Sequence, residues 1–267
     1  MIEIRGLVHV FPEGTRALDG VDLTIGDGER IAIIGQNGSG KSTLVRHFNG
    51  LLRPTEGRVL LDGGDTANTK VARLAARIGL AFQDPDRQIF AGRVRREVEF
   101  GPRNLGLRGQ ALERAVDEAL AAVGLADQAN ANPYDLGYSR RKLLALASIL
   151  AMRTPVVVLD EPTTGQDARG VRRVQAIVES LHEAGRTVIA VSHDMRFVAE
   201  TFARVIVMRT GTVVLDGSPA EVFAESNWEA LASTYVEPPL PARVGARLGL
   251  GAIPTESGLV EAIAARR

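Results

Sequence analysis

Hydrophobic and polar residues near the start of the chain follow patterns that predict strands. Residues 2–10 read as a strand, and residues 21–25 alternate apolar and polar side chains, which is the period of a half-buried strand. Residues 31–34 form a short apolar run before a glycine-rich loop, and residues 58–64 read as a strand and turn. The first quarter of the chain is therefore predicted to be rich in strands.

Later apolar runs are continuous. Residues 156–159 and 187–191 are wholly apolar, as in central parallel strands covered on both faces, and 78–82 is a shorter run. Residues 205–208 and 212–215 read as a hairpin. Between the predicted strands of the whole chain lie segments that are predicted to be helical. These helical segments are 44–48, 71–77, 112–123, 139–152 and 171–182. Strands that alternate with helices predict an α/β fold with a parallel or mixed sheet.

Composition narrows the classes of function. The chain of 267 residues is 45% apolar and has 32 basic and 32 acidic residues, so its net charge gives no reason to expect direct binding of nucleic acid. It has no cysteine, which excludes disulfides and thiolate metal sites. We find no signal peptide and no apolar run long enough to span a bilayer, so we expect a cytosolic chain whose contact with a membrane is made through a partner.

The loop after residues 31–34 matches the phosphate-binding P-loop pattern, G-x-x-x-x-G-K-[ST]. Its residues are Gly35, Gln36, Asn37, Gly38, Ser39, Gly40, Lys41, Ser42 and Thr43. Glycines allow backbone N–H groups to surround an anion, and the following helix adds its positive end. Lys41 is predicted to reach the β- and γ-phosphates of a nucleotide, and the Ser42 hydroxyl to ligate Mg²⁺. The alternative is a glycine-rich turn that caps a helix.

Three strands end in residues that can do chemistry. Gln83 follows 78–82, Asp160 and Glu161 follow 156–159, and His193 follows 187–191. Ligands of open α/β sheets bind beyond the carboxyl ends of the strands, so we expect these ends to converge on the P-loop. Asp160 is predicted to hold Mg²⁺ and Glu161 to orient an attacking water.

The remaining roles are assigned with their alternatives. His193 is predicted to donate to the γ-phosphate, although a lone histidine is more often structural. Gln83 offers a metal ligand and a hinge, and Asp160 could instead be a helix N-cap. Phe11 could stack on a base or pack on the sheet edge. The basic residues 140–142 near the start of a predicted helix oppose its dipole, and such breaks of a local rule often mark a functional surface.

This ordered set of motifs resembles the ATP-binding cassette (ABC) ATPases over roughly residues 1–225. The P-loop, Gln83 as Q-loop, 156–161 as Walker B, 164–167 as D-loop and His193 as switch histidine carry the resemblance, and Phe11 matches the adenine-stacking A-loop aromatic. The resemblance implies a P-loop NTPase fold with an N-terminal antiparallel part, and ATP hydrolysis with Mg²⁺ at a dimer interface.

The same resemblance implies a division of the chain. Residues 1–93 and 153–227 would form the nucleotide-binding core, and residues 94–152 an inserted helical subdomain. The proline- and alanine-rich residues 228–267 would be a C-terminal extension, either weakly ordered or docked on another surface.

A finer resemblance is to the energy-coupling-factor (ECF) importers of vitamins and transition-metal ions. It rests on Phe82-Gln83-Asp84-Pro85-Asp86-Arg87-Gln88-Ile89-Phe90, on residues 100–107 and on Pro238-Pro239. It implies a peripheral subunit on the cytoplasmic face of the membrane, bound to a transmembrane coupling subunit and a second ABC ATPase. An exporter ATPase is the nearest alternative. Soluble ABC proteins that act on ribosomes or DNA usually carry two cassettes or coiled coils, which this sequence lacks.

One motif departs from the family. The signature loop usually reads Leu-Ser-Gly-Gly-Gln, whereas this chain has Leu136 followed by Gly137, Tyr138, Ser139 and Arg140. In the family this loop closes over ATP held by the partner's P-loop. Gly137 offers no hydroxyl and Tyr138 adds a bulky ring, while Arg140 brings a charge that could replace lost hydrogen bonds. We therefore expect a heterodimer with one strong and one weak site; a catalytically weak regulatory ATP-binding module is the alternative.

Overall fold

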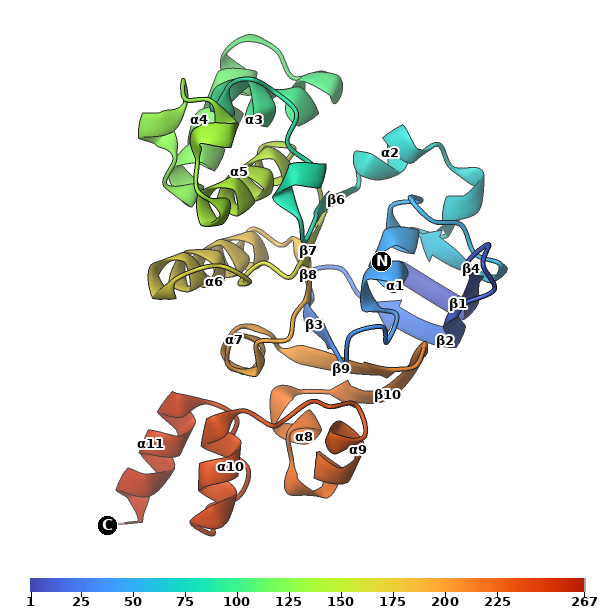
Figure 1. The fold of residues 1–267 in the computed structure, drawn as a ribbon, viewed down its shortest axis with the longest axis vertical. Coiled ribbons are helices and arrows are strands. Elements are labelled where there is room, and N and C mark those ends of the chain that lie inside the picture. The colour runs from blue at the N-terminus through green and yellow to red at the C-terminus, as the bar shows by residue number, and fades with distance from the viewer. Residues whose placement is uncertain (267) are drawn as a thin grey trace.

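Two β-sheets form the centre of the molecule, whose computed structural model describes residues 1–266 (Figure 1). The first sheet has the order β2-β1-β4-β5 and is antiparallel, and the second has the order β10-β9-β3-β8-β7-β6. The strands are β1 (Ile2–Val10), β2 (Arg16–Ile25), β3 (Arg30–Ile34), β4 (Glu56–Leu61), β5 (Gly64–Asp65), β6 (Ile78–Ala81), β7 (Val156–Asp160), β8 (Thr187–Val191), β9 (Arg204–Arg209) and β10 (Thr212–Gly217).

Helices surround the sheets and extend the molecule at both ends (Figure 1). They are α1 (Lys41–Phe48), α2 (Val71–Ala75), α3 (Val94–Asn104), α4 (Gly109–Val123), α5 (Tyr138–Ala151), α6 (Ala168–Glu183), α7 (Met195–Thr201), α8 (Pro219–Val222), α9 (Trp228–Ala232), α10 (Leu240–Arg247) and α11 (Glu256–Ala265). Helices α3 to α5 lie together at one end, and α10 and α11 lie at the other. None of the helices described in residues 1–266 is long and apolar enough to cross a bilayer.

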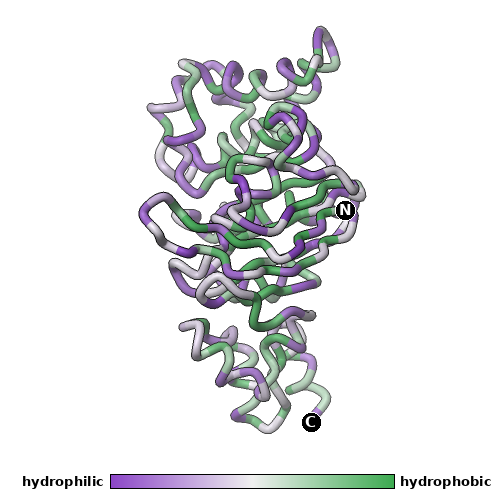
Figure 2. The backbone as a smooth tube through the Cα atoms, turned by 90° about the vertical axis from the view of Figure 1, so that its right-hand side faces the viewer, coloured by the Kyte–Doolittle hydropathy of each residue, from purple (hydrophilic) through white to green (hydrophobic). Residues whose placement is uncertain are grey.

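The second sheet is parallel except at its edge. Strands β6, β7, β8, β3 and β9 run in the same direction, and β10 pairs antiparallel with β9. Every residue of β7 and β8 is buried, which explains why both sequences are uninterrupted apolar runs. Hydrophobic residues accordingly concentrate in the middle of the molecule in Figure 2. The prediction of an α/β fold with a mixed sheet is confirmed.

Two hydrophobic clusters hold these layers. Helix α1 packs between the two sheets, where Leu44, Val45 and Phe48 join residues of β1, β2 and β3. The opposite face of the second sheet packs against α5, α6 and α7, and the same cluster continues into α3 and α4. The P-loop helix is therefore fixed on both sides, while α3 and α4 pack mainly on α5, with a smaller direct contact between α4 and α6.

Most predicted elements occur near the expected positions. The hairpin is β9–β10, and the segments 112–123, 139–152 and 171–182 correspond to α4, α5 and α6. Strand β2 begins earlier than predicted, at Arg16, and α2 ends at Ala75.

The C-terminal segment 228–265 forms helices. Of the two interpretations of this segment, the one that predicted weak order is therefore wrong. Residues 228–265 contain α9, α10 and α11. The prolines do not prevent this, because Pro239 and Pro241 stand at the start of α10, where the missing N–H costs nothing. Helix α11 is capped by Thr255, whose side chain accepts from the N–H of Gly258, and a Cβ on Gly245 would lie 2.4 Å from the carbonyl oxygen of Gly251. The backbone of α10 therefore approaches the following turn too closely for a side chain at position 245.

Candidate nucleotide-binding site

The P-loop connects β3 to α1 and requires glycine at two positions. Gly35 has φ 140°, and a Cβ there would lie 2.1 Å from the carbonyl oxygen of Met208. Gly40 has φ 101°, and a Cβ there would lie 2.5 Å from the carbonyl oxygen of Ala17. Side chains at these positions would force the loop away from β9 and β2. The glycines therefore set the backbone conformation that the motif requires.

Lys41, the first residue of α1, bends back over the loop. Its Nζ donates to the carbonyl oxygens of Gly35 at 2.7 Å and Gln36 at 2.8 Å. The side chain is buried, and this burial lowers the pKa of Lys41, while Glu161 and Asp160 act in the opposite direction. The ammonium group is thus held at the mouth of the loop, where it can exchange carbonyl oxygens for phosphate oxygens.

The Ser42 hydroxyl and the Asp160 carboxylate lie close together where α1 meets the end of β7. Ser42 Oγ donates to Asp160 Oδ1 at 3.2 Å, although the two residues are far apart in sequence. Asp160 is buried, and its burial raises the pKa of the carboxyl group, while the Ser42 hydrogen bond lowers it. A cation beside Asp160 would stabilise the charged carboxylate. Hard oxygen ligands of this kind suit Mg²⁺, so the residues present fit the ion.

Glu161 lies next to Asp160 and faces the end of β8. Its Oε2 is 2.6 Å from His193 Nδ1, and its backbone N–H donates to the carbonyl oxygen of Val191 at 2.9 Å. Glu161 has φ 52°, a left-handed conformation that is uncommon for residues other than glycine. Such strained residues cluster at functional sites. The carboxylate and imidazole are therefore placed together on the sheet edge that carries the P-loop.

Two adjoining hollows cover this edge. One, of about 640 Å³, is lined by Gly35, Gln36, Asn37, Gln83, Glu161, His193, Met195, Tyr235, Val236 and Glu237. The other, of about 230 Å³, is lined by Asn37, Gly38, Gly40, Lys41, Ser42, Thr43, Gln83, Glu161 and Val191. The structure thus brings the strand ends and the P-loop together, as expected from the sequence.

Phe11 does not line either hollow. Its ring contacts His9 edge-on at a centroid distance of 4.6 Å, and His9 contacts His47 of α1 at 4.8 Å. Phe11 is partly exposed. It is therefore connected to the P-loop helix through two histidines to which the sequence analysis gave no role.

The altered signature loop lies outside both hollows and contacts the D-loop of its own chain. Gly137 directly precedes α5, whose first residue is Tyr138. Ser139 Oγ donates to Gln166 Oε1 at 2.8 Å, and Gln166 Nε2 donates to the Ser139 carbonyl oxygen at 3.0 Å. The Tyr138 ring lies where a Cβ on Gly165 would be 2.8 Å away. Arg140 is exposed.

Three residues near the site were not singled out from the sequence. Gln88 Oε1 accepts from the Phe82 N–H at 3.0 Å, and Gln88 Nε2 donates to the Ala145 carbonyl oxygen at 2.7 Å, which joins the segment before Gln83 to α5. Lys142 of α5 is buried and donates to the Glu161 carbonyl oxygen. Tyr235, 85% exposed with φ 55°, lines the larger hollow. Lys142 had a sequence signal as one of the basic residues 140–142, and Gln88 as part of the segment from Phe82 to Phe90, but neither was given a role.

The chain is similar to known proteins in both sequence and fold. The model of the ABC transporter family matches residues 18–164. The energy-coupling factor transporter ATP-binding protein EcfA of Methanothermobacter thermautotrophicus is 40% identical over 228 residues, which cover 85% of this chain and 73% of the relative. The solved structure of cbiO1 from Clostridium perfringens, described as part of the ABC transporter complex cbiONQ, has a TM-score of 0.76 and 36% identity, and the match covers 93% of this chain and 98% of that one.

One relative is much longer than this chain. A protein of Caldanaerobacter subterraneus, provisionally named as an ABC transporter ATP-binding protein, is 43% identical over 249 residues, which cover 93% of this chain. The chain spans 43% of the length of that relative.

Proposed function

The chain belongs to the ABC transporter family of ATPases, with ECF transporter ATP-binding proteins among its relatives, and we propose that it binds ATP with Mg²⁺ and hydrolyses it to drive uptake by an ECF-type importer. One observation supports the proposal most strongly. The Ser42–Asp160 and Glu161–His193 pairs meet beside the P-loop, although they come from three separate strand ends. This proximity supports the assignment of metal-binding and water-orienting roles around one phosphate.

Each group in the site has a distinct part in the proposed reaction. Backbone N–H groups of the P-loop and Lys41 bind the phosphates and neutralise their charge, and Ser42 and Asp160 hold Mg²⁺, with Gln83 as a third candidate ligand. Glu161 accepts a hydrogen bond from the attacking water and orients it. His193, held by Glu161, donates to the transferring phosphoryl group. Catalysis of this kind is largely positioning and electrostatics, which is consistent with a site built from rigid strand ends.

We further propose the partners and location that the ECF relatives suggest. The chain would be a peripheral subunit on the cytoplasmic face of a membrane, bound to a transmembrane coupling subunit and a second ABC ATPase. The imported substrate, a vitamin or a transition-metal ion in this class, would be chosen by a membrane protein. The segment around Gln83 and the helices α3–α5 would carry the movement, because Gln88 connects that loop to α5.

A heterodimer is proposed over a homodimer. The chain's own P-loop side carries every expected group, whereas the start of α5 presents Gly137, Tyr138 and Ser139 in place of Ser-Gly-Gly. Ser139 already bonds to Gln166, so its hydroxyl is engaged within the chain. A partner ATPase with the usual signature would complete the site on this P-loop.

Hydrolysis assays test the proposal. The chain is mixed with a candidate partner ATPase and its turnover is compared with that of each subunit alone; a rise on mixing is expected. Lys41→Ala is expected to abolish the rise, and Lys70→Ala, at an exposed lysine on the same chain, serves as the control. Recovery of a transmembrane subunit with the chain from membranes is the expected companion result. A rise on mixing that survives Lys41→Ala would contradict the proposal.

A catalytically weak regulatory module is the second candidate. It is favoured by the Tyr138 ring, which covers Gly165 of the D-loop and stands where the family has a glycine. In that case the chain would bind ATP with the same residues, and mixing with a partner would change the partner's turnover while Lys41→Ala left the rate of the mixture unchanged.

A further inference from the structure

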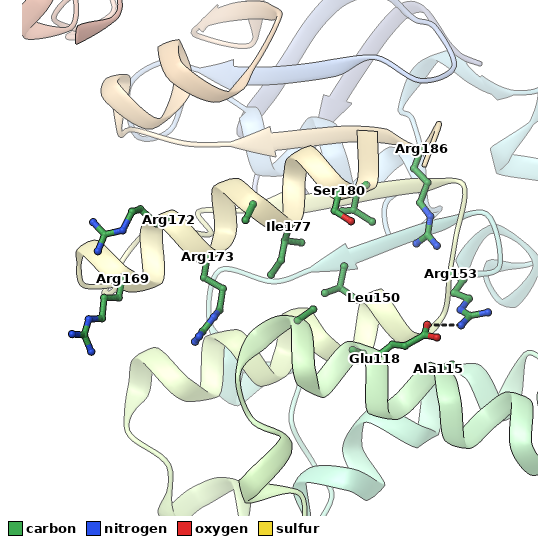
Figure 3. A pocket seen from close by; sticks show the side chains of 14 residues that line it. Ala115, Glu118, Leu150, Arg153, Arg169, Arg172, Arg173, Ile177, Ser180 and Arg186 are labelled. Atoms are coloured by element: carbon green, nitrogen blue, oxygen red, sulfur yellow. Dashed lines mark hydrogen bonds and ion pairs between the residues drawn. The ribbon is translucent and has the colours of Figure 1, made fainter. Parts of the chain in front are cut away.

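A pocket of about 590 Å³ lies between α4, the end of α5 and α6, and shares no lining residue with the hollows over the P-loop (Figure 3). Its charged lining is strongly one-sided. Five arginines and one acidic residue line it: Arg153, Arg169, Arg172, Arg173, Arg186 and Glu118. The whole chain carries equal numbers of basic and acidic residues, so this excess is local.

Two of these arginines, Arg153 and Arg186, lie near each other, and only one of them is paired with a carboxylate. Arg153 Nη2 forms an ion pair with Glu118 Oε2 at 2.6 Å. Figure 3 shows the Arg186 side chain directed toward that pair from the connection between α6 and β8. Within residues 1–266 the Arg186 guanidinium forms no ion pair, and burial together with the charge of Arg153 lowers its pKa. A second anion between the two guanidinium groups would remove this repulsion.

The other arginines approach the pocket from α6. Arg173 points toward the gap between α6 and α4, and its Nη1 donates to the Val123 carbonyl oxygen at 3.1 Å (Figure 3). Arg169 and Arg172 are exposed at the beginning of α6. Positive charge therefore borders the pocket at both ends of the helix.

Between these ends, the wall of the pocket is apolar. Leu150, Ile177 and Leu181 line it together with four alanines, and the Ser180 hydroxyl lies among them. Small side chains leave the space open, and its volume is within the range of sites for small organic ligands. An inorganic ion alone would leave the apolar wall uncovered. The lining fits a molecule that carries both an anionic group and an apolar or aromatic body.

We propose that this pocket binds a small organic phosphate. Arg153 and Arg186 hold the phosphate, with Ser180 as an additional donor, and the apolar body lies against α4 and α6. The planar guanidinium group suits phosphate oxygens because it can donate two parallel hydrogen bonds. Because the pocket is bordered by both α4 and α6, the bound molecule would contact the helices of 94–152 and the core together. The proposal is independent of the one for the P-loop.

The test uses 1-naphthyl phosphate as a probe and Lys41→Ala as the background, so that the P-loop does not contribute. Titration calorimetry is expected to show one binding site. 1-Naphthol and inorganic phosphate, which each carry half of the probe, are expected to bind at least about tenfold more weakly. Arg186→Gln is expected to lower the affinity for the probe by about tenfold or more, which is typical for loss of a charge-assisted hydrogen bond.

Two further variants separate a built site from general attraction. Glu118→Gln is expected to tighten binding of the probe, because it removes the carboxylate that pairs with Arg153 and would compete with the phosphate. Arg96→Gln, at an exposed arginine of α3, removes the same charge outside the pocket and is expected to change affinity by less than about twofold. The proposal is overturned if the probe does not bind, or if Arg96→Gln weakens it as much as Arg186→Gln. Binding of an acidic peptide but not of the probe would also overturn it and make the pocket a protein-docking groove.

Discussion

The starts of α1 and α5 resemble each other in charge but differ in geometry. Neither helix has an acidic residue in its first turn, and each carries a buried lysine close to its start, Lys41 in α1 and Lys142 in α5. At α1 the preceding Gly40 is left-handed and Lys41 turns back over the loop carbonyls. At α5 the preceding Gly137 is extended, and Lys142 turns inward to the Glu161 carbonyl oxygen.

This difference shows that the two helix starts are built for different contacts. The α1 start keeps its cation facing the hollow, so it can bind an anion by itself. The α5 start directs Lys142 into the protein and exposes Arg140 instead. In the dimer proposed above, the α1 side would hold this chain's own nucleotide, and the α5 side would meet the nucleotide of a partner. The two are joined, because Lys142 and Gln88 both connect α5 to the strand ends.

The largest expected effect is on the α1 side. Glu161→Gln keeps the shape of the side chain but removes the charge that orients water, so turnover is expected to fall by about 100-fold or more. ATP binding should persist, because Lys41 and the P-loop are untouched. A filtration binding assay beside a phosphate-release assay measures both quantities, with Glu183→Gln at an exposed position of α6 as the control. Unchanged turnover would remove Glu161 from the mechanism.

A smaller gain is expected on the α5 side. Gly137→Ser combined with Tyr138→Gly restores the hydroxyl and the small residue of the usual signature. A Cβ on Gly137 meets nothing within 4 Å, so serine fits without displacement. One added hydrogen bond is worth roughly 1 kcal/mol, which predicts a rise in turnover of about fivefold for the chain alone.

One result would contradict this asymmetry between the helix starts: a restored variant that, without any partner, hydrolyses ATP no faster than the unmodified chain. Gly137→Ser alone separates the hydroxyl from the effect of the Tyr138 ring on Gly165.

The contrast also shows what the sequence could and could not reveal. The P-loop and the polar residues after apolar strands are local signals, and the rule that parallel strand ends meet at one sheet edge was enough to place them together. The order of strands and helices could also be predicted, because the spacing of apolar residues is likewise a local signal. The contacts of Gln88 and Tyr235 could not be predicted, because they depend on the packing of α5 and on the path of the C-terminal segment.

Composition misled at the C-terminus. Proline and alanine enrichment suggested weak order, but the prolines stand in the first turn of α10, where they are compatible with a helix. Phe11 illustrates a different limit. Its ring contacts His9, two residues before it, and only the contact of His9 with His47 of α1 joins elements that are distant in sequence.

The connection between the two ends can be weakened at Gln88. Gln88→Ala removes the acceptor of the Phe82 N–H and the donor to Ala145, so stability is expected to fall by about 1–3 kcal/mol. Urea denaturation measures the loss, and Gln110→Ala, at an exposed glutamine of α4, is expected to change stability little. If both substitutions have the same small effect, Gln88 does not hold the loop.

The smallest expected effect is a dependence of stability on pH that originates at Lys142. Burial lowers the pKa of Lys142 from 10.5 to about 8, against the opposing effect of Glu161 and Asp160. Between these values the unfolded chain binds more protons than the folded one, so the Lys142 contribution to stability rises with pH from about 8 to about 10.5. Melting temperatures at pH 7.5 and 9.5 should therefore differ less in Lys142→Met than in the unmodified protein. Lys70→Met, at an exposed lysine, should keep the unmodified difference, and an equal change in both variants would show that Lys142 ionises normally.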